Sequence, residues 1–168
     1  IFAIIWGVLL YVRFLGFADL PTAFSDWIVS LEQSPMLTLI FILAAYAILG
    51  MFMDAIGMLL LTLPVVYPAL LALNGGEAVT AADSAFGVSG AGFAIWFGII
   101  IVKMAELCLI TPPIGLNCFV VAGVRPECSV QDVFRGAIPF FIADFITIAV
   151  LVSLPGIVLW LPGLMGYT

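Results

Sequence analysis

The side chains best suited to bind ions or small solutes lie in two stretches of the chain that hold almost no charge. Asp54 is the only charged residue between Glu32 and Glu77, and Thr111 and Asn117 lie in the second stretch, residues 107–124, which has none. A carboxylate, a hydroxyl and free backbone carbonyls can hold a small cation, while free N–H groups at a helix start can hold an anion. These two stretches could therefore enclose a cation and an anion side by side.

The element that carries Thr111 must be interrupted, because Pro112 and Pro113 follow it directly. Both prolines lack an N–H group and restrict the residue before them. A continuous helix over residues 93–124 would also measure about 48 Å, against a hydrocarbon core of roughly 30 Å. The sequence predicts two half-helices that meet at residues 111–113, the second one capped by Thr111 and starting at Pro112. The alternative is a proline kink that binds nothing.

The composition is that of an integral membrane protein of the all-α class. Hydrophobic residues make up 65% of the chain and charged residues 8%, and the mean hydropathy is +1.37. Several apolar runs are long enough to cross a bilayer, so that the length allows about five or six passes. The net charge of −6 leaves no basic surface for phosphates, which argues against nucleic acid as a partner.

The chain divides into five predicted elements. The segment around Asp54 is read either as a re-entrant hairpin with Asp54 at its tip, which is favoured, or as two spans joined by a tight turn. In the second form Asp54 is exposed to water at the membrane surface. The elements are a helix over 1–17, an interfacial arm helix over 18–33 anchored by Trp27, a hairpin unit over 34–73, the broken helix over 93–124 and a last span over 137–161.

Lysine and arginine predict the orientation of these elements. None occurs from Phe14 to Val102, whereas Arg125 and Arg135 bracket the loop at 125–135. By the positive-inside rule, that loop is expected in the cytoplasm and the polar loop at 77–92 outside.

Other residues that could do chemistry have plainer interpretations. Lys103 and Glu106 are expected to neutralise each other on one helix face, and Asp144 is expected to be solvated near a charged loop. Three cysteines are read as small packing residues. The chain has no histidine and no phosphate-binding glycine loop, so nucleotide-driven transport within it is unsupported. Its start inside an apolar run is typical of a fragment.

Several motifs, in this order, resemble the large membrane subunit of a tripartite ATP-independent periplasmic (TRAP) transporter, in its C-terminal half. They are Gly-Met-Phe-Met-Asp-Ala-Ile-Gly at 50–57, Leu-Pro-Val-Val-Tyr-Pro at 63–68, Ile-Thr-Pro-Pro-Ile-Gly-Leu-Asn at 110–117, Ile-Pro-Phe-Phe at 138–141 and Leu-Trp-Leu-Pro at 159–162. The resemblance spans residues 4–162.

The resemblance implies a multi-pass protein of the bacterial inner membrane that takes up small organic acids, such as C4-dicarboxylates or sialic acid, with Na⁺ as the coupling ion and an elevator-type motion. It implies as partners a small membrane subunit, a periplasmic substrate-binding protein and the N-terminal half of the same permease, without which this half should not transport. The substrate-binding residues it implies are Asp54, Thr111, Pro112 and Asn117, and the Na⁺ ligands are Gly50, Asp54, Thr111 and Gly115.

Two alternatives from other classes remain open at this point. One is an intramembrane aspartyl protease that uses Asp54 and Asp144, although Asp144 follows Phe-Ile-Ala and not the Gly-x-Gly that such enzymes share. The other is a structural membrane subunit that transports nothing, in which substitutions of Asp54 and Thr111 would leave uptake intact.

Overall fold

The computed structural model describes residues 2–53, 55–111, 115–125 and 127–167, and within these ranges the chain is helical with no strand. The all-α prediction is therefore confirmed for the described residues. The helices are α1 Phe2–Phe17, α2 Leu20–Ser30, α3 Pro35–Phe52, α4 Ala55–Asn74, α5 Gly90–Ile110, α6 Leu116–Val124, α7 Val130–Ser153 and α8 Pro155–Leu164.

By length and composition, α3, α4, α5 and α7 can each cross a membrane. A further span is possible if α1 and α2, which are bent by 61° relative to each other, cross together. The chain is therefore a multi-pass membrane protein. Since α3 and α4 each have the length of a span, the re-entrant form of the hairpin unit stays a prediction.

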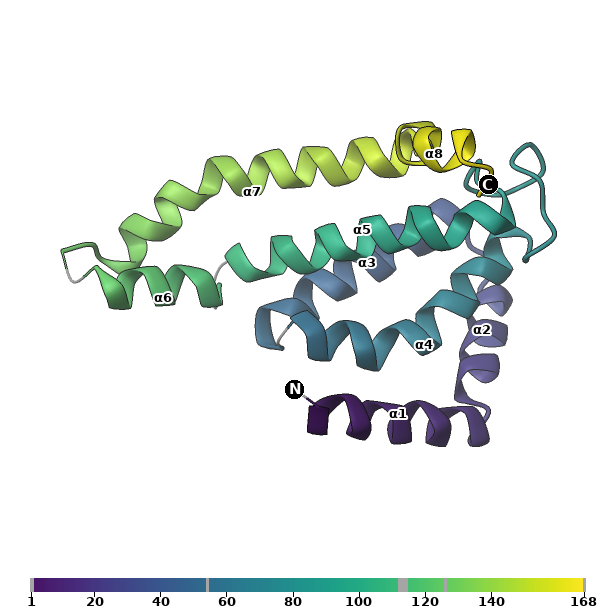
Figure 1. The fold of residues 1–168 in the computed structure, drawn as a ribbon, viewed down its shortest axis with the longest axis horizontal. Helices are drawn as coiled ribbons and strands as arrows, with labels where there is room; N and C mark the ends of the chain where they lie inside the picture. The colour runs from purple at the N-terminus through teal and green to yellow at the C-terminus, as the bar shows by residue number, and fades with distance from the viewer. Residues whose placement is uncertain (1, 54, 112–114, 126, 168) are drawn as a thin grey trace.

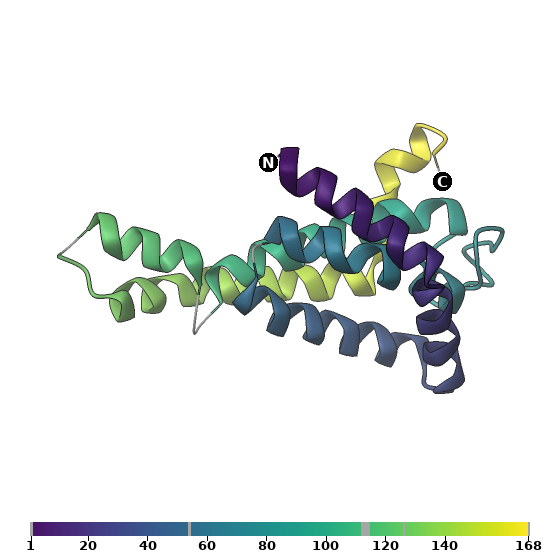
Figure 2. The same ribbon diagram turned by 90° about the horizontal axis from the view of Figure 1, so that it is seen from below.

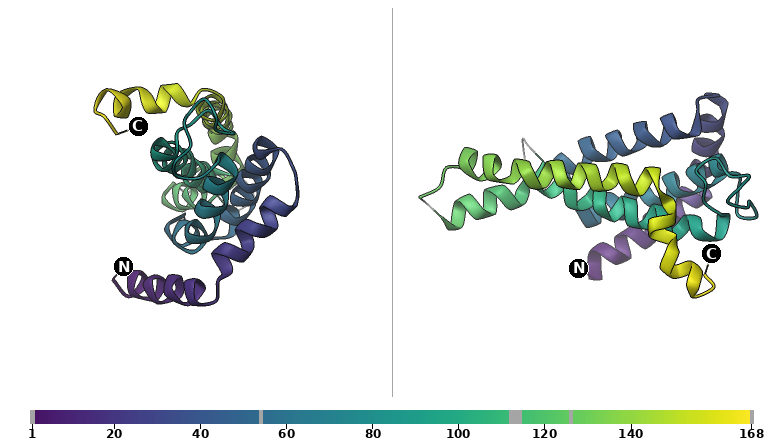
Figure 3. Two further views of the ribbon diagram at one scale, coloured as in Figure 1. Left: turned by 90° about the vertical axis from the view of Figure 1, so that its right-hand side faces the viewer. Right: turned by 90° about the horizontal axis from the view of Figure 1, so that it is seen from above.

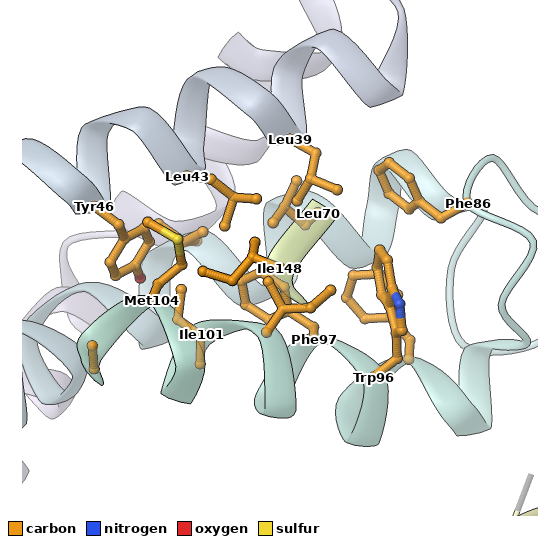
Figure 4. Packing of buried hydrophobic residues seen from close by; sticks show 14 of the residues in the cluster. Leu39, Leu43, Tyr46, Leu70, Phe86, Trp96, Phe97, Ile101, Met104 and Ile148 are labelled. Atoms are coloured by element: carbon orange, nitrogen blue, oxygen red, sulfur yellow. The ribbon is translucent and has the colours of Figure 1, made fainter. Parts of the chain in front are cut away.

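Helix α5 is the centre of the bundle. Half of its span (50%) is buried inside the chain, against 6% for α7, because α3, α4, α7 and α8 all pack against it (Figure 1). Its buried side chains recur every three or four residues, and Trp96, Phe97, Ile101 and Met104 lie among side chains of α3, α4 and α7 (Figure 4). This packing fixes the neighbouring helices relative to α5.

Helix α2 is the predicted arm helix, and it packs across α4. Helix α2 lies at a large angle to the long helices and connects them to α1 (Figure 1; Figure 3, left). Ile28 is buried and Phe24 packs against the core, whereas Trp27 is exposed. The side of α2 that carries Phe24 and Ile28 thus faces the bundle, with Trp27 at its edge.

Asn74 organises the loop between α4 and α5. Its amide nitrogen donates to the Val88 carbonyl at 2.8 Å, its amide oxygen accepts from the Phe86 N–H at 3.2 Å, and the side chain is fully buried. The loop backbone also lies directly on Gly90, where a methyl group would overlap the Glu77 carbonyl. The polar loop predicted at 77–92 is thus a folded cap over the end of α4 and α5.

Helix α7 has other bounds than the last span predicted at 137–161. It starts at Val130, because Ser129 and Asp132 form a capping box, and it continues through Pro139 to Ser153. Helix α8 then follows, with Pro155 in its first turn. Together with α6, the first part of α7 projects beyond the ends of α3 and α4 (Figures 1 and 2).

Candidate functional site

The ends of α3 and α5 are in contact. Gly50, in the last turn of α3, lies against the Cys108 side chain of α5, and the Cys108 thiol donates to the Tyr46 and Ala47 carbonyls of α3 at 3.5 and 3.9 Å. The fold therefore brings together the helix ends that lead into the two segments which the sequence singles out for ion and solute binding.

Some of the predicted site residues fall outside the described ones. Asp54 and Pro112, both proposed as ligands, are among them, together with Pro113 and Ile114. The structure places the residues on either side of them, which are Met53 and Ala55 at the tip and Thr111 and Gly115 at the break.

Thr111 ends α5. It is the C-cap residue of α5, and its buried hydroxyl donates to the Leu107 carbonyl at 2.6 Å. A threonine in the last turn of a helix commonly donates to the carbonyl four residues back. The predicted capping of a half-helix that starts at Pro112 falls on residues outside the described ones and stays a prediction. The hydroxyl oxygen keeps lone pairs that a cation can use.

The described part of the second half-helix starts at Leu116. Gly115 is its N-cap, and the Gly115 carbonyl accepts from the N–H groups of Cys118 at 2.8 Å and Phe119 at 3.3 Å. The Gly115 N–H donates to the Thr111 carbonyl at 3.0 Å, so backbone bonds span the break. Asn117 is exposed on the first turn of α6, and its amide is therefore accessible to a solute.

The ends of α5 and α6 present opposite partial charges to the break. Pro112 and Pro113 cannot donate to the Cys108 and Leu109 carbonyls, four residues back, and the Thr111 N–H bonds the Cys108 carbonyl at 3.3 Å. Carbonyl oxygens at a helix end suit a cation, and the N–H groups of a first helical turn suit a carboxylate.

Gly50 is buried in the contact between α3 and α5. A methyl group at this position would overlap the sulfur and the Cβ atom of Cys108. The observed role of Gly50 is thus to let the two helices approach, and any role as an ion ligand would have to come from its carbonyl.

An apolar pocket lies beside the break, between the end of α5 and α7. Its volume is about 310 Å³, and its lining is Ile110, Phe134, Ala137, Ile138, Phe141 and Ile142. The Phe134 ring also packs over Gly115. This pocket has no charged lining residue that would attract an acid, and its lining is apolar.

Asp144 is paired with a lysine of the bundle, contrary to the expectation that it is solvated. The Lys103 Nζ atom lies 2.8 Å from an Asp144 oxygen and 2.6 Å from a Glu106 oxygen. The spacing of Lys103 and Glu106 predicted their contact, whereas the contact of α5 with α7 brings in Asp144. An aspartyl-protease pair of Asp54 and Asp144 would require Asp144 to exchange this lysine for a second carboxyl group.

Known proteins resemble the chain over almost its full length. A sequence model of the family described as "Tripartite ATP-independent periplasmic transporter, DctM component" matches residues 1–157. The sialic acid TRAP transporter permease protein SiaT of Haemophilus influenzae is 31% identical over 84% of this chain and 20% of its own length. The large permease protein DctM of the C4-dicarboxylate TRAP transporter of Vibrio cholerae is 28% identical over 96% of this chain and 32% of its own length.

A third relative is the large permease protein YiaN of the 2,3-diketo-L-gulonate TRAP transporter of Escherichia coli, which is 31% identical over 84% of this chain and 29% of its own length. The chain spans a third or less of these three relatives, and no solved structure matches it. All three are named as transporter permeases and not as enzymes. The chain therefore belongs to the DctM family of tripartite ATP-independent periplasmic transporter components.

Proposed function

We propose that the chain is part of a large permease that takes up small organic acids of the C4-dicarboxylate or sialic acid type across the bacterial inner membrane, with Na⁺ as the coupling ion. The named substrates of the relatives, which are sialic acid, a C4-dicarboxylate and 2,3-diketo-L-gulonate, are all carboxylic acids. The proposed partners are a small membrane subunit, a periplasmic substrate-binding protein and the remaining half of the permease. The elevator-type motion rests on the family resemblance alone.

The observation that supports this proposal is the contact between α3 and α5 near their ends, where Gly50 lies against Cys108 and the Cys108 thiol donates to the Tyr46 and Ala47 carbonyls. Discontinuous helices that meet in this way form ion and substrate sites in secondary transporters. We place Na⁺ at the carbonyl end of α5, with the Thr111 hydroxyl oxygen and the Asp54 carboxylate as its principal ligands.

The substrate carboxylate is placed on the other side of the break, at the first turn of α6. The exposed Asn117 amide and the N–H groups of this turn supply hydrogen-bond donors. The proposed substrate contact of Pro112 rests on the family resemblance alone. Of the two glycines proposed as Na⁺ ligands, Gly115 has its carbonyl engaged by two N–H groups of α6. Gly50 is the better candidate for an additional carbonyl ligand, since it lies one turn before Asp54.

The test is uptake by the full-length permease, assembled with its small subunit and binding protein, against Na⁺ concentration. Thr111→Val removes the hydroxyl oxygen while it keeps the shape, and should raise the Na⁺ concentration for half-maximal uptake by about tenfold. Thr111→Ser, which keeps the oxygen, is the matched control and should stay near the wild type.

Asp54→Asn should lower Na⁺-dependent uptake more than it lowers the amount of folded permease, since an intramembrane carboxylate is tolerated mainly for what it binds. An unchanged Na⁺ dependence in both Asp54→Asn and Thr111→Val would remove the two segments from the ion site. The chain would then be a structural part of the permease.

A further inference from the structure

Helices α3 and α5 approach each other most closely where Gly50 meets Cys108. A methyl group on Gly50 would overlap both side-chain atoms of Cys108 and would lie 3.4 Å from the Met58 sulfur. Small residues allow such close approach of helices inside membranes. The separation of the two helices at this level is therefore set by the absence of a side chain on one helix and by a two-atom side chain on the other.

The Cys108 thiol adds direction to this contact. It is buried, and it donates to the Tyr46 carbonyl at 3.5 Å. In an α-helix the carbonyl of residue 46 also serves the N–H of residue 50, so the sulfur lies over the hydrogen bond that Gly50 makes within α3. The contact thus constrains sliding of the two helices as well as their distance.

Tyr46 extends the contact to α4. Its hydroxyl is hydrogen-bonded to the Thr62 hydroxyl at 2.6 Å, and Thr62 also bonds the Met58 carbonyl at 2.8 Å. The tyrosine ring is buried. Helix α4 is therefore linked to Tyr46, whose carbonyl accepts from the Cys108 thiol of α5.

This point lies about one turn before each chain break. Residue 54 follows Gly50 by four residues, and Thr111 follows Cys108 by three. The Cys108 carbonyl also accepts from the Thr111 N–H at 3.3 Å, while the Thr111 hydroxyl bonds the Leu107 carbonyl. A displacement between Gly50 and Cys108 is passed to the tip on one side and to Thr111 on the other.

We propose that Cys108 is a positioning residue of the transport site, which acts through Gly50 to hold the tip of α3 and α4 at a fixed distance from the α5–α6 break. This inference rests on the proposed function, because it assigns the two segments to one site. It gives Gly50 a steric role beside the carbonyl role considered above, and it gives Cys108 a role that its identity as a small packing residue did not predict.

The test adds a side chain on the α3 side of the contact and then removes the one on the α5 side, in the full-length permease. Gly50→Ala should raise the Na⁺ concentration for half-maximal uptake by about tenfold. The double variant Gly50→Ala/Cys108→Gly moves the bulk from α5 to α3 and should return that concentration to within about threefold of the wild type. A residue that only stabilises the fold would change the amount of folded permease and leave the Na⁺ dependence unchanged.

Gly98→Ala is the matched control, because a methyl group at this position of α5 meets nothing within 4 Å. It should leave the Na⁺ dependence as it is. If Gly50→Ala cannot be recovered folded, Cys108→Val, which enlarges the other side of the same contact, takes its place.

A distance measurement separates this inference from the proposed function. Spin labels at two exposed positions, Phe52 near the tip and Val120 on α6, report the spacing directly in a background without other accessible cysteines. The mean distance should lengthen in Gly50→Ala and return in the double variant, even if the wild type shows no Na⁺-dependent uptake, in which case only the proposed function fails. An unchanged distance and Na⁺ dependence in Gly50→Ala, or a double variant as impaired as the single one, would overturn the role of Cys108.

Discussion

The indole nitrogen of Trp96 donates a hydrogen bond of 2.9 Å to the carbonyl of Leu151, which is the carbonyl that Pro155 leaves without its helical partner. In a continuous helix the N–H of residue 155 would occupy this acceptor, and proline has none. Trp96 is fully buried on α5. The end of α7 is therefore held on the central helix by a donor that replaces the missing backbone bond.

Trp96→Phe should lower the midpoint of thermal unfolding of the full-length permease. The substitution leaves a carbonyl without a donor, which typically costs about 1–3 kcal/mol, and it also removes buried ring volume. The effect is measured by heating the purified permease in detergent and recording its unfolding. Trp160→Phe is the matched control, since Trp160 is 68% exposed, and it should have little effect within this chain.

The hydrogen-bond component of that loss can be isolated with Pro155→Ala, which supplies an N–H for the Leu151 carbonyl. The double variant Trp96→Phe/Pro155→Ala should be less impaired than the sum of the two single variants predicts. Strict additivity would show that only the ring volume of Trp96 matters.

A second link between the same helices is ionic. Lys103 has two carboxylate partners, and the side chains of Lys103 and Asp144 are 25% and 26% exposed, against 56% for Glu106. Lys103→Met should be the most harmful single substitution of the three residues, because it leaves two carboxylates in membrane-spanning helices without a counter-charge. The insertion of one charged side chain at the centre of such a helix costs about 2.5–3.5 kcal/mol. The amount of folded permease in the membrane measures this ranking, and Glu106→Gln should be the mildest substitution.

The pairing of Lys103 with Asp144 can be checked by removing both charges. Lys103→Met/Asp144→Leu should recover part of the folded permease lost in Lys103→Met, since apolar replacement of a buried pair is often close to neutral. A double variant that is recovered in smaller amounts than the single one would mean that the two residues do not depend on each other.

Local chemistry was sufficient to predict the interruption of the α5–α6 element. Two adjacent prolines remove backbone donors wherever they occur, and no tertiary contact can restore them. The bonding of the Thr111 hydroxyl was harder to predict, because a threonine hydroxyl can donate back to a carbonyl four residues earlier and accept from an N–H group ahead of it. The described residues show the first of these bonds, to Leu107.

Long-range contacts account for what the sequence did not predict. Asp144 was assigned to solvent because charges lie nearby along the chain, but its partner is 41 residues away. The amide of Asn74 bonds Val88 and Phe86, which lie 14 and 12 residues further along the chain, and no local pattern marks these partners. The contact of Gly50 with Cys108 depends on helix packing that no spacing within either helix encodes.

The last prediction concerns orientation, and native and introduced cysteines make it measurable. The loop between α4 and α5 and the connection between α6 and α7 lie at opposite ends of the bundle (Figure 3, right). Only the second, which includes Cys128, is flanked by arginines, Arg125 and Arg135.

A cysteine at the exposed position Ala82 should react with an impermeant maleimide added to intact cells. The exposed Cys128 should react only after the membrane is opened, because segments rich in lysine and arginine stay in the cytoplasm. Cys108 and Cys118 are buried and should stay unlabelled under both conditions, which makes them internal controls. The reverse pattern would invert the orientation, whereas labelling of both positions from outside would contradict the crossing of the membrane between them.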